Sequence, residues 1–177
     1  MTDPSAVTRW LTDDEQRAWR AYLAASGRLQ QTLDADLQRD AGMPHAYYMI
    51  LAMLSETPSR GARMTELAES LMISASRLSH AVKRLEALGW IRKDADPGDG
   101  RVTYACLTDA GLRALVDAAP GHVATVASHV FDTLTAEQVG QLYEISAAIL
   151  GALAPGQSAD EVLRLGRTAQ AEQPDQV

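Results

Sequence analysis

The sequence predicts a mainly α-helical protein with one small β-hairpin. The apolar content of 46% is mostly alanine and leucine, with nine aromatic residues among 177, which suits packed helices better than stacked sheets. Thr-x-x-Glu and Thr-x-x-Gln motifs at residues 12–15 and 135–138 are typical of helix N-termini. Residues 94–100 are rich in Asp, Pro and Gly between two short strand-like segments, which indicates a hairpin.

Two helices are expected in the first third of the chain. The motif at residues 12–15 predicts a long helix that continues to about Asp40, with apolar residues three or four positions apart. Gly42 suits the left-handed position that ends a helix, and Pro44 suits the first turn of a second helix at residues 45–56. Residues 57–61 are expected to form a loop.

A helix-turn-helix and its hairpin are expected next. Thr65 is the expected cap of a short helix at 66–71, and Ser74 caps a second helix at 75–88 that Gly89 ends. Strands at 90–93 and 102–107 then flank the turn, which predicts a wing.

The last third is expected to be helical. Thr108 caps a helix that Pro120 and Gly121 should interrupt, with helical structure on both sides to about Asp132. The motif at 135–138 opens a helix that ends near Gly151. In the tail at 154–177, residues 158–161 favour one short helix, and residues 171–177 are expected to be mobile.

The helix at 75–88 has an apolar face and a polar face, and the polar face is a candidate DNA-binding surface. Residues 74–93 contain five basic residues and one acidic residue, a net charge of +4, although the chain as a whole carries −7. Arg77 and His80 are the expected base readers, and Ser74, Ser79, Lys83 and Arg84 are expected to position the backbone. The candidate contacts are Ser74, Ser76, Arg77, Ser79, His80, Lys83 and Arg84. The alternative is a polar surface that packs against protein.

The hairpin adds a second candidate contact. Arg101 at its tip could enter a narrow minor groove, with Asp99 holding the guanidinium through a charged hydrogen bond. The alternative is a surface ion pair of little energetic value.

These motifs, in this order, resemble the MarR family of bacterial regulators over roughly residues 10–153. The resemblance rests on Leu67-Ala68, Ile73-Ser74, Leu78-Ser79, Arg84-Leu85-Glu86, Leu88-Gly89, the wing from Asp96 to Arg101, and Leu107-Thr108-Asp109-Ala110-Gly111. It implies an obligate homodimer with two winged lobes in successive major grooves of a palindromic operator, and a repressor that a small aromatic or phenolic acid releases. His80 stands where relatives often have arginine, and Gly100 replaces a common basic residue.

The expected architecture is therefore a winged helix-turn-helix at 58–106, embedded in a helical dimerisation domain at 8–57 and 107–153. The expected partners are double-stranded DNA, a second copy of the chain and an aromatic acid. The candidate ligand residues are His45, Tyr47, Tyr48 and Met49, since aromatic rings, an imidazole and a thioether suit a flat acid. Tyr48 in the core, with the other three on the surface, is the competing interpretation. A protein-interaction module without specific DNA binding is the alternative function.

Other functional classes lack support in the sequence. No arrangement of nucleophile and base, glycine-rich phosphate loop or carboxylate pair stands out, so an enzyme and a bound cofactor are not expected. His122 and His129 lie about 10 Å apart along a helix, too far to share one zinc ion. No apolar run reaches the ~20 residues of a membrane span. The single cysteine, Cys106, is expected to be buried and structural, and a cytoplasmic location is expected.

Overall fold

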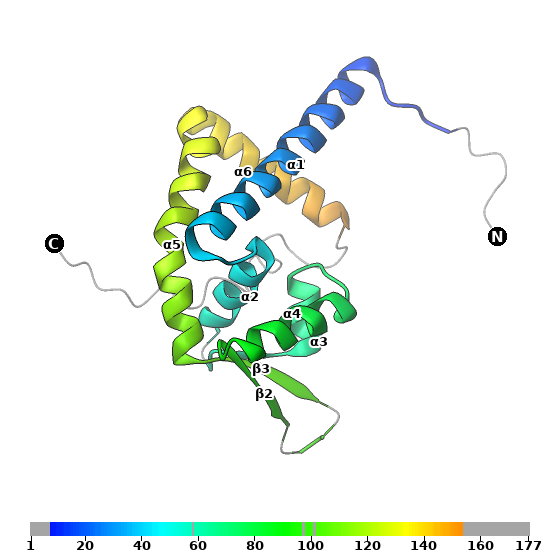
Figure 1. The fold of residues 1–177 in the computed structure, drawn as a ribbon. Coiled ribbons are helices and arrows are strands. Elements are labelled where there is room, and N and C mark those ends of the chain that lie inside the picture. The colour runs from blue at the N-terminus through cyan, green and yellow to red at the C-terminus, as the bar shows by residue number, and fades with distance from the viewer. Residues whose placement is uncertain (1–7, 58, 97, 101, 154–177) are drawn as a thin grey trace. The chain divides into compact units, whose positions relative to one another are not determined.

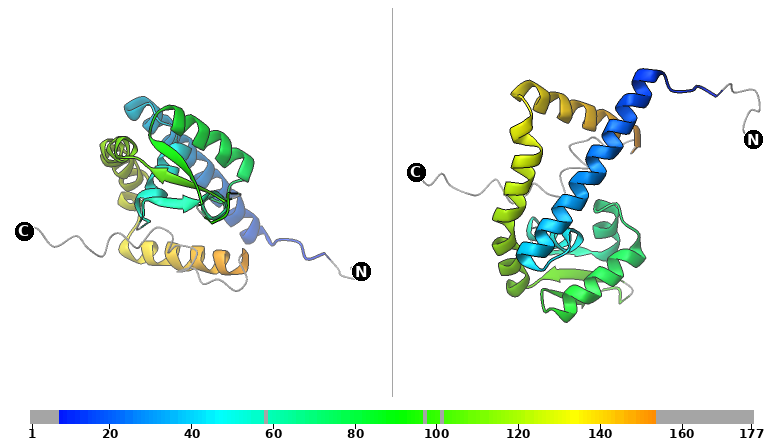
Figure 2. Two further views of the ribbon diagram at one scale, coloured as in Figure 1. Left: turned by 90° about the horizontal axis from the view of Figure 1, so that it is seen from below. Right: turned by 45° about the horizontal axis from the view of Figure 1, so that its top comes forward.

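The computed structural model describes residues 8–57, 59–96, 98–100 and 102–153 (Figures 1 and 2). The predicted mainly helical fold with a hairpin wing is confirmed. The elements in chain order are α1 (Asp13–Ala41), α2 (His45–Ser55), β1 (Gly61–Arg63), α3 (Met64–Ser70), α4 (Ala75–Ala87), β2 (Ile91–Ala95), β3 (Thr103–Leu107), α5 (Asp109–His129), the 3-10 turn η1 (Phe131–Thr133) and α6 (Ala136–Leu153). The chain divides into two compact units, residues up to Thr32 and residues from Leu33 onward, which are described separately.

The first unit contains the N-terminal part of α1, and the predicted capping box is confirmed there. The backbone N–H of Thr12 donates to the Glu15 carboxylate at 2.8 Å, and the N–H of Glu15 donates to Thr12 Oγ1 at 3.2 Å. Further along the helix, the rings of Trp19 and Tyr22 stack with centroids 6.1 Å apart, and both side chains remain exposed. This segment therefore has an apolar surface that its own residues leave open to solvent.

The second unit contains the hydrophobic core, which lies around α2. Ile50, Leu51 and Leu54 of this helix are fully buried, and α2 packs against β3, α4 and α5. Leu67, Leu78, Val82, Leu85 and Ile91 complete the core from the helix-turn-helix and the first wing strand. The core thus holds α3 and α4 against the sheet, while Figure 1 shows the β2–β3 hairpin projecting away from the helices.

The sheet has three antiparallel strands in the order β1-β3-β2, and β1 was not expected. Residues 57–61 were predicted as a loop, but Gly61 begins a strand and lies opposite Cys106 of β3. A Cβ atom on Gly61 would lie only 2.9 Å from Cys106 Sγ, so the glycine permits this close pairing. Three residues are too few to show the alternating pattern that identifies a strand in sequence.

Two helix boundaries differ from the prediction. The expected Thr65 cap is wrong, since α3 begins at Met64 and its N-cap residue Arg63 makes no side-chain capping bond. The expected interruption at Pro120 is also wrong, because α5 runs unbroken from Asp109 to His129. Pro120 has no N–H to donate to the carbonyl of Val116, four residues earlier. Both residues are exposed, so water can hydrogen-bond that carbonyl instead. The helix ends instead at His129, and η1 begins at Phe131.

The last described helix, α6, has an apolar surface that the second unit leaves uncovered. Its predicted capping box is confirmed, with Thr135 N–H donating to Gln138 Oε1 at 2.9 Å and Gln138 N–H donating to Thr135 Oγ1 at 3.3 Å. None of the residues of α6 is buried. Its exposed apolar side chains are Leu142, Tyr143, Ile145, Ile149 and Leu153. The expected short helix at 158–161 and the mobile end lie outside the described residues.

Candidate nucleic-acid interface

Helix α4 divides into a buried face and an exposed polar face. Leu78, Val82 and Leu85 are fully buried, at spacings of four and three residues. Ser74 caps the helix as predicted, because its Oγ accepts the backbone N–H of Arg77 at 3.3 Å. The candidate residues Ser74, Ser76, Arg77, Ser79, His80, Lys83 and Arg84 are all exposed. The structure thus places the predicted set together, with its helical members on the side of α4 opposite the core.

The turn between α3 and α4 fixes where that face points. Met72 adopts a left-handed φ of 52° without being glycine, and its N–H donates to the carbonyl of Glu69 at 3.0 Å. The N–H of Ile73 then donates to the carbonyl of Ala68 at 3.0 Å, and the Ile73 side chain packs against the core. Ala68 is buried where α3 and α4 pack together.

The wing turn is held by Asp96, a residue of the wing motif for which the sequence predicted no separate role. Asp96 Oδ1 accepts the backbone N–H groups of Gly98 and Asp99 at 2.8 and 3.1 Å. These bonds lower the pKa of Asp96, so the carboxylate stays ionised near neutral pH. Arg101 lies outside the described residues, so its predicted contact with Asp99 stays a prediction.

Tyr104 of β3 connects the wing turn to β1, the strand before α3. Arg63 Nε donates to the Tyr104 hydroxyl at 3.0 Å, and the guanidinium carbon lies 5.9 Å from the centre of the ring. Tyr104 also hydrogen-bonds Asp96, which contributes to the low pKa of that carboxyl. Arg63 and Tyr104 pair directly between β1 and β3. These hydrogen bonds from Arg63 through Tyr104 to Asp96 were not predicted from the sequence, because β1 itself was not predicted.

The candidate ligand residues do not all meet, and the structure adds a residue to them. Tyr48 is buried, Tyr47 packs at the edge of the core, and Met49 is exposed. The rings of His45 and Tyr48 both contact His122 of α5, with centroids 5.5 and 4.2 Å from it. His122 was considered only as a partner of His129, and no local pattern connects it to His45.

The two stacked imidazoles, called here the histidine pair (His45 and His122), are both partly buried. Burial lowers the pKa of both, and each lies near a charged or titratable neighbour: Asp34 raises the pKa of His45, and His45 lowers that of His122. The Nδ1 atom of His122 is buried without a hydrogen-bond partner in the part of the chain that the structure describes. The pair is therefore neutral near pH 7 and sensitive to acid.

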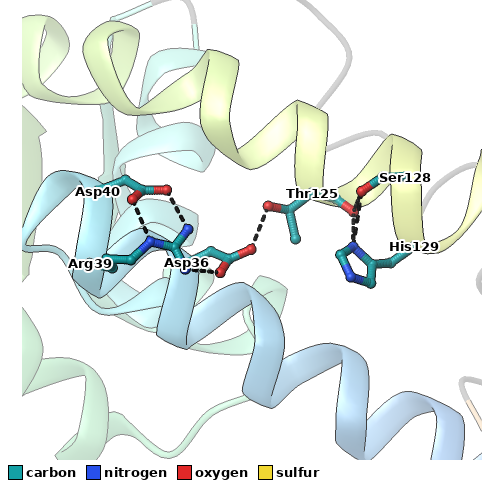
Figure 3. Close-up of polar contacts among 6 residues, drawn as sticks. All are labelled: Asp36, Arg39, Asp40, Thr125, Ser128 and His129. Carbon is teal, nitrogen blue, oxygen red and sulfur yellow. Dashed lines mark hydrogen bonds and ion pairs between the residues drawn. The ribbon is translucent and has the colours of Figure 1, made fainter.

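A polar network fastens the end of α1 to α5 (Figure 3). Thr125 Oγ1 donates to Asp36 at 2.8 Å, and Arg39 contributes a second bond to the same carboxylate at 2.7 Å. Both contacts lower the pKa of Asp36. On α5, Ser128 and the carbonyl of Thr125 both contact His129 Nδ1 at 3.0 Å. The segment of α1 after Leu33 is thus held against the helix that contains His122.

The remaining candidates have structural environments. Cys106 is half-buried in β3, and burial, followed by a hydrogen bond with Asp94, raises the pKa of its thiol. A thiol with a raised pKa is a poor nucleophile, which agrees with a structural role. Among the described residues, no group of His, Cys, Asp or Glu could hold a metal ion. No helix in the same residues is both long and apolar enough to cross a membrane.

Comparisons with known proteins agree with this geometry. The family model described as the MarR family matches residues 41–102. Sco3205 from Streptomyces coelicolor, a MarR family transcriptional regulator solved in complex with DNA, is 51% identical; the match covers 83% of this chain and 96% of that one, with a TM-score of 0.80. AbsC from the same organism, also a MarR family regulator, is 40% identical over 85% of this chain and 100% of its own, with a TM-score of 0.78.

A curated relative, the HTH-type transcriptional regulator YxaD of Bacillus subtilis, is 36% identical over 83 residues. That match covers 47% of this chain and 57% of YxaD, so the chain spans little more than half of this relative. The relatives are transcriptional regulators and not enzymes, as the sequence predicted. Because the identity to Sco3205 extends over nearly all of that protein, the chain belongs to the MarR family of transcriptional regulators.

Proposed function

We propose that the chain is a sequence-specific DNA-binding regulator that recognises palindromic operators as a homodimer. The observation that supports this most strongly is the exposed polar face of α4, which is anchored by a buried apolar face and a Ser74 cap. A helix presented in this way fits the major groove of B-DNA. The DNA complex of the 51% identical Sco3205 supports the same function for this chain.

Individual contacts divide between base edges and backbone. Arg77 and His80, near the N-terminal end of α4, read bases, because the first turns of a recognition helix lie deepest in the groove. Arg101 enters the minor groove from the wing with Asp99 as its partner. The backbone-positioning residues are Ser74, Ser76, Ser79, Lys83 and Arg84.

The homodimer forms through the helical regions at 8–57 and 107–153, and the lobe at 58–106 binds DNA. The support is the apolar surface of α6, where Ile145 and Tyr143 are 59% and 53% exposed although the helix is well capped. Covering such a surface with a second copy buries apolar area in both chains at once. A two-fold dimer then requires an operator with two inverted half-sites.

The dimer acts as a repressor where its operator overlaps a promoter, and a small aromatic acid releases it. The candidate ligand site comprises His45, Tyr47, Tyr48 and Met49, now with His122 beside the first and third of these. Such a ligand acts only if it favours a lobe spacing that mismatches the operator. The coupling is reciprocal, so calorimetry should find weaker acid binding when operator DNA is present. Equal binding with and without DNA would contradict this switch.

Selection of bound duplexes from a random pool, using the full chain, tests the DNA-binding proposal. The expected result is enrichment of an inverted repeat with half-sites about 10 base pairs apart, centre to centre. The selected duplex, placed over a promoter, should lower reporter expression when the chain is present. If no sequence is enriched and the chain binds all duplexes equally or not at all, the result would favour a protein-interaction module without specific DNA binding.

A further inference from the structure

A cleft of about 380 Å³ lies beside the recognition helix, where the start of α3, the middle of α4 and the wing strands meet. It is lined by Met64 and Val102 and by five polar residues that define what is called here the basic cleft: Arg63, Thr65, Ser79, Lys93 and Thr103. Each of these side chains has N–H or O–H donors, and no acidic residue lines the cleft within the described part of the chain. The lining therefore suits an anion.

Another cavity of the second unit has the opposite character. It measures about 140 Å³ between the end of α1 and α5, and Asp36, Asp40 and Asp117 line it together with His122. An anion would be repelled there by three carboxylates. Of these two cavities, the basic cleft is the one that favours a phosphate.

Lys93 is held in position at the cleft. Its Nζ lies 3.1 Å from the Glu86 carboxylate, and a third of its side chain is exposed. The ammonium group has three donors, and Glu86 accepts at one side, so the group can bind a second oxygen. Arg63, on the opposite edge of the sheet, is oriented by the Tyr104 hydroxyl through its Nε, and the same nitrogen lies 3.8 Å from Glu66 Oε1. Two cations are thus fixed before any ligand arrives.

The position of the cleft relative to α4 identifies the anion. Ser79 belongs both to the exposed polar face of α4 and to the lining of the cleft. The major groove is about 12 Å wide and bordered by phosphates, so a helix inside it has a sugar–phosphate strand alongside. Hydroxyl groups, Lys and Arg are the side chains that contact those phosphates.

We propose that the basic cleft binds a phosphodiester of the DNA strand that borders the groove occupied by α4. The proposal rests on the DNA-binding function proposed above and adds Lys93, Arg63, Thr65 and Thr103 to the contacts. These residues position the protein on the duplex without reading its sequence. A free inorganic anion shares the same chemistry and is distinguished by the test.

The test compares Lys93→Met with Arg92→Met in the full chain. Both remove one cation from β2, but Arg92 forms its ion pair with Asp94 and does not line the cleft. Affinity is measured on the selected operator and on an unrelated duplex over a range of salt concentrations. Lys93→Met should lower both affinities roughly tenfold, and the slope of log K against log salt should flatten by about 0.9 for each half-site. Arg92→Met should leave both quantities unchanged.

Two further variants separate charge from folding. Lys93→Arg should restore the salt slope, because it keeps the cation. Thr65→Val, at an exposed site, should lower the affinity for both duplexes severalfold. The slope of log K against log salt should not change, because the lost hydroxyl has no charge. Unfolding curves show whether each variant remains folded, and Thr65→Val still tests the cleft if Lys93→Met does not fold.

The outcomes are distinct. Wild-type protein that binds no duplex would refute the proposed function itself. If the wild-type protein binds DNA and neither Lys93→Met nor Thr65→Val changes its affinity, the phosphate contact at the basic cleft is refuted and the proposed function is not. Inorganic phosphate, titrated by NMR, is the last arm: phosphate binding that Lys93→Met abolishes, with duplex binding unchanged, would assign the cleft to a free anion and overturn the proposal.

Discussion

Gly111 is the position where a single added methyl group should do most damage. A Cβ atom there would lie 2.2 Å from the carbonyl oxygen of Trp90 and 2.8 Å from Leu107 Cδ1. The Trp90 carbonyl also accepts the N–H of Thr108 at 3.0 Å and its hydroxyl at 3.1 Å. Relieving the clash therefore requires α5 to move away from the end of α4 by more than 1 Å, and this movement stretches the bonds that begin α5.

The magnitude for Gly111→Ala follows from these contacts. Overpacking costs about 1–3 kcal/mol, and each weakened hydrogen bond costs about 1 kcal/mol. Alanine recovers about 1 kcal/mol through its helix propensity. The net loss in the free energy of unfolding is about 2–3 kcal/mol, and the melting temperature should fall by about 5–10 °C.

Urea unfolding measures this loss, at equal protein concentrations because dimerisation contributes to stability. Gly121→Ala is the matched control: it lies in the same helix, and its Cβ would meet nothing within 4 Å. The control should gain about 0.5–1 kcal/mol. A Gly111→Ala protein as stable as wild type would refute the packing described for α5.

Three other predictions follow. Ser74→Ala removes the cap of α4 and should lower the free energy of unfolding by about 1 kcal/mol in urea titrations, and an unchanged value would contradict the cap. Burial lowers the pKa of His45 and His122 in the folded protein. As pH falls from about 7 to 5, the unfolded chain therefore binds more protons than the folded chain. Stability should drop over that range, and should drop less in His122→Phe; parallel profiles would exclude the histidine pair as the cause. Ile145→Asp should convert the dimer to a monomer in sedimentation, whereas an intact dimer would mean that α6 is not the interface.

The parts of the fold that sequence predicted are those set by neighbouring residues. Both capping boxes join residues three apart, and Gly42 and Gly89 adopt φ values of 61° and 73° at helix ends. The exposed face of α4 likewise follows from apolar residues at three- and four-residue spacing. Local geometry was therefore sufficient to place the candidate recognition residues.

The features that sequence did not predict depend on residues far apart in the chain. The pairing of β1 with β3 and the contact of His45 with His122 have no local pattern. The Arg63–Tyr104 bond depends on that pairing. Pro120 was misread for a different reason: it lies on an exposed surface, where the lost hydrogen bond can be replaced by water.

The central claim is that α4 reads DNA, and the affinity of Arg77→Ala for the selected operator tests it most directly. Arg113→Ala is the matched control, because Arg113 is an exposed arginine of α5 outside the candidate nucleic-acid interface. The claim predicts a loss of about 1–3 kcal/mol per half-site for Arg77→Ala, with relaxed preference at one base position, and no loss for Arg113→Ala. Equal operator affinity for both folded variants and wild type would contradict it.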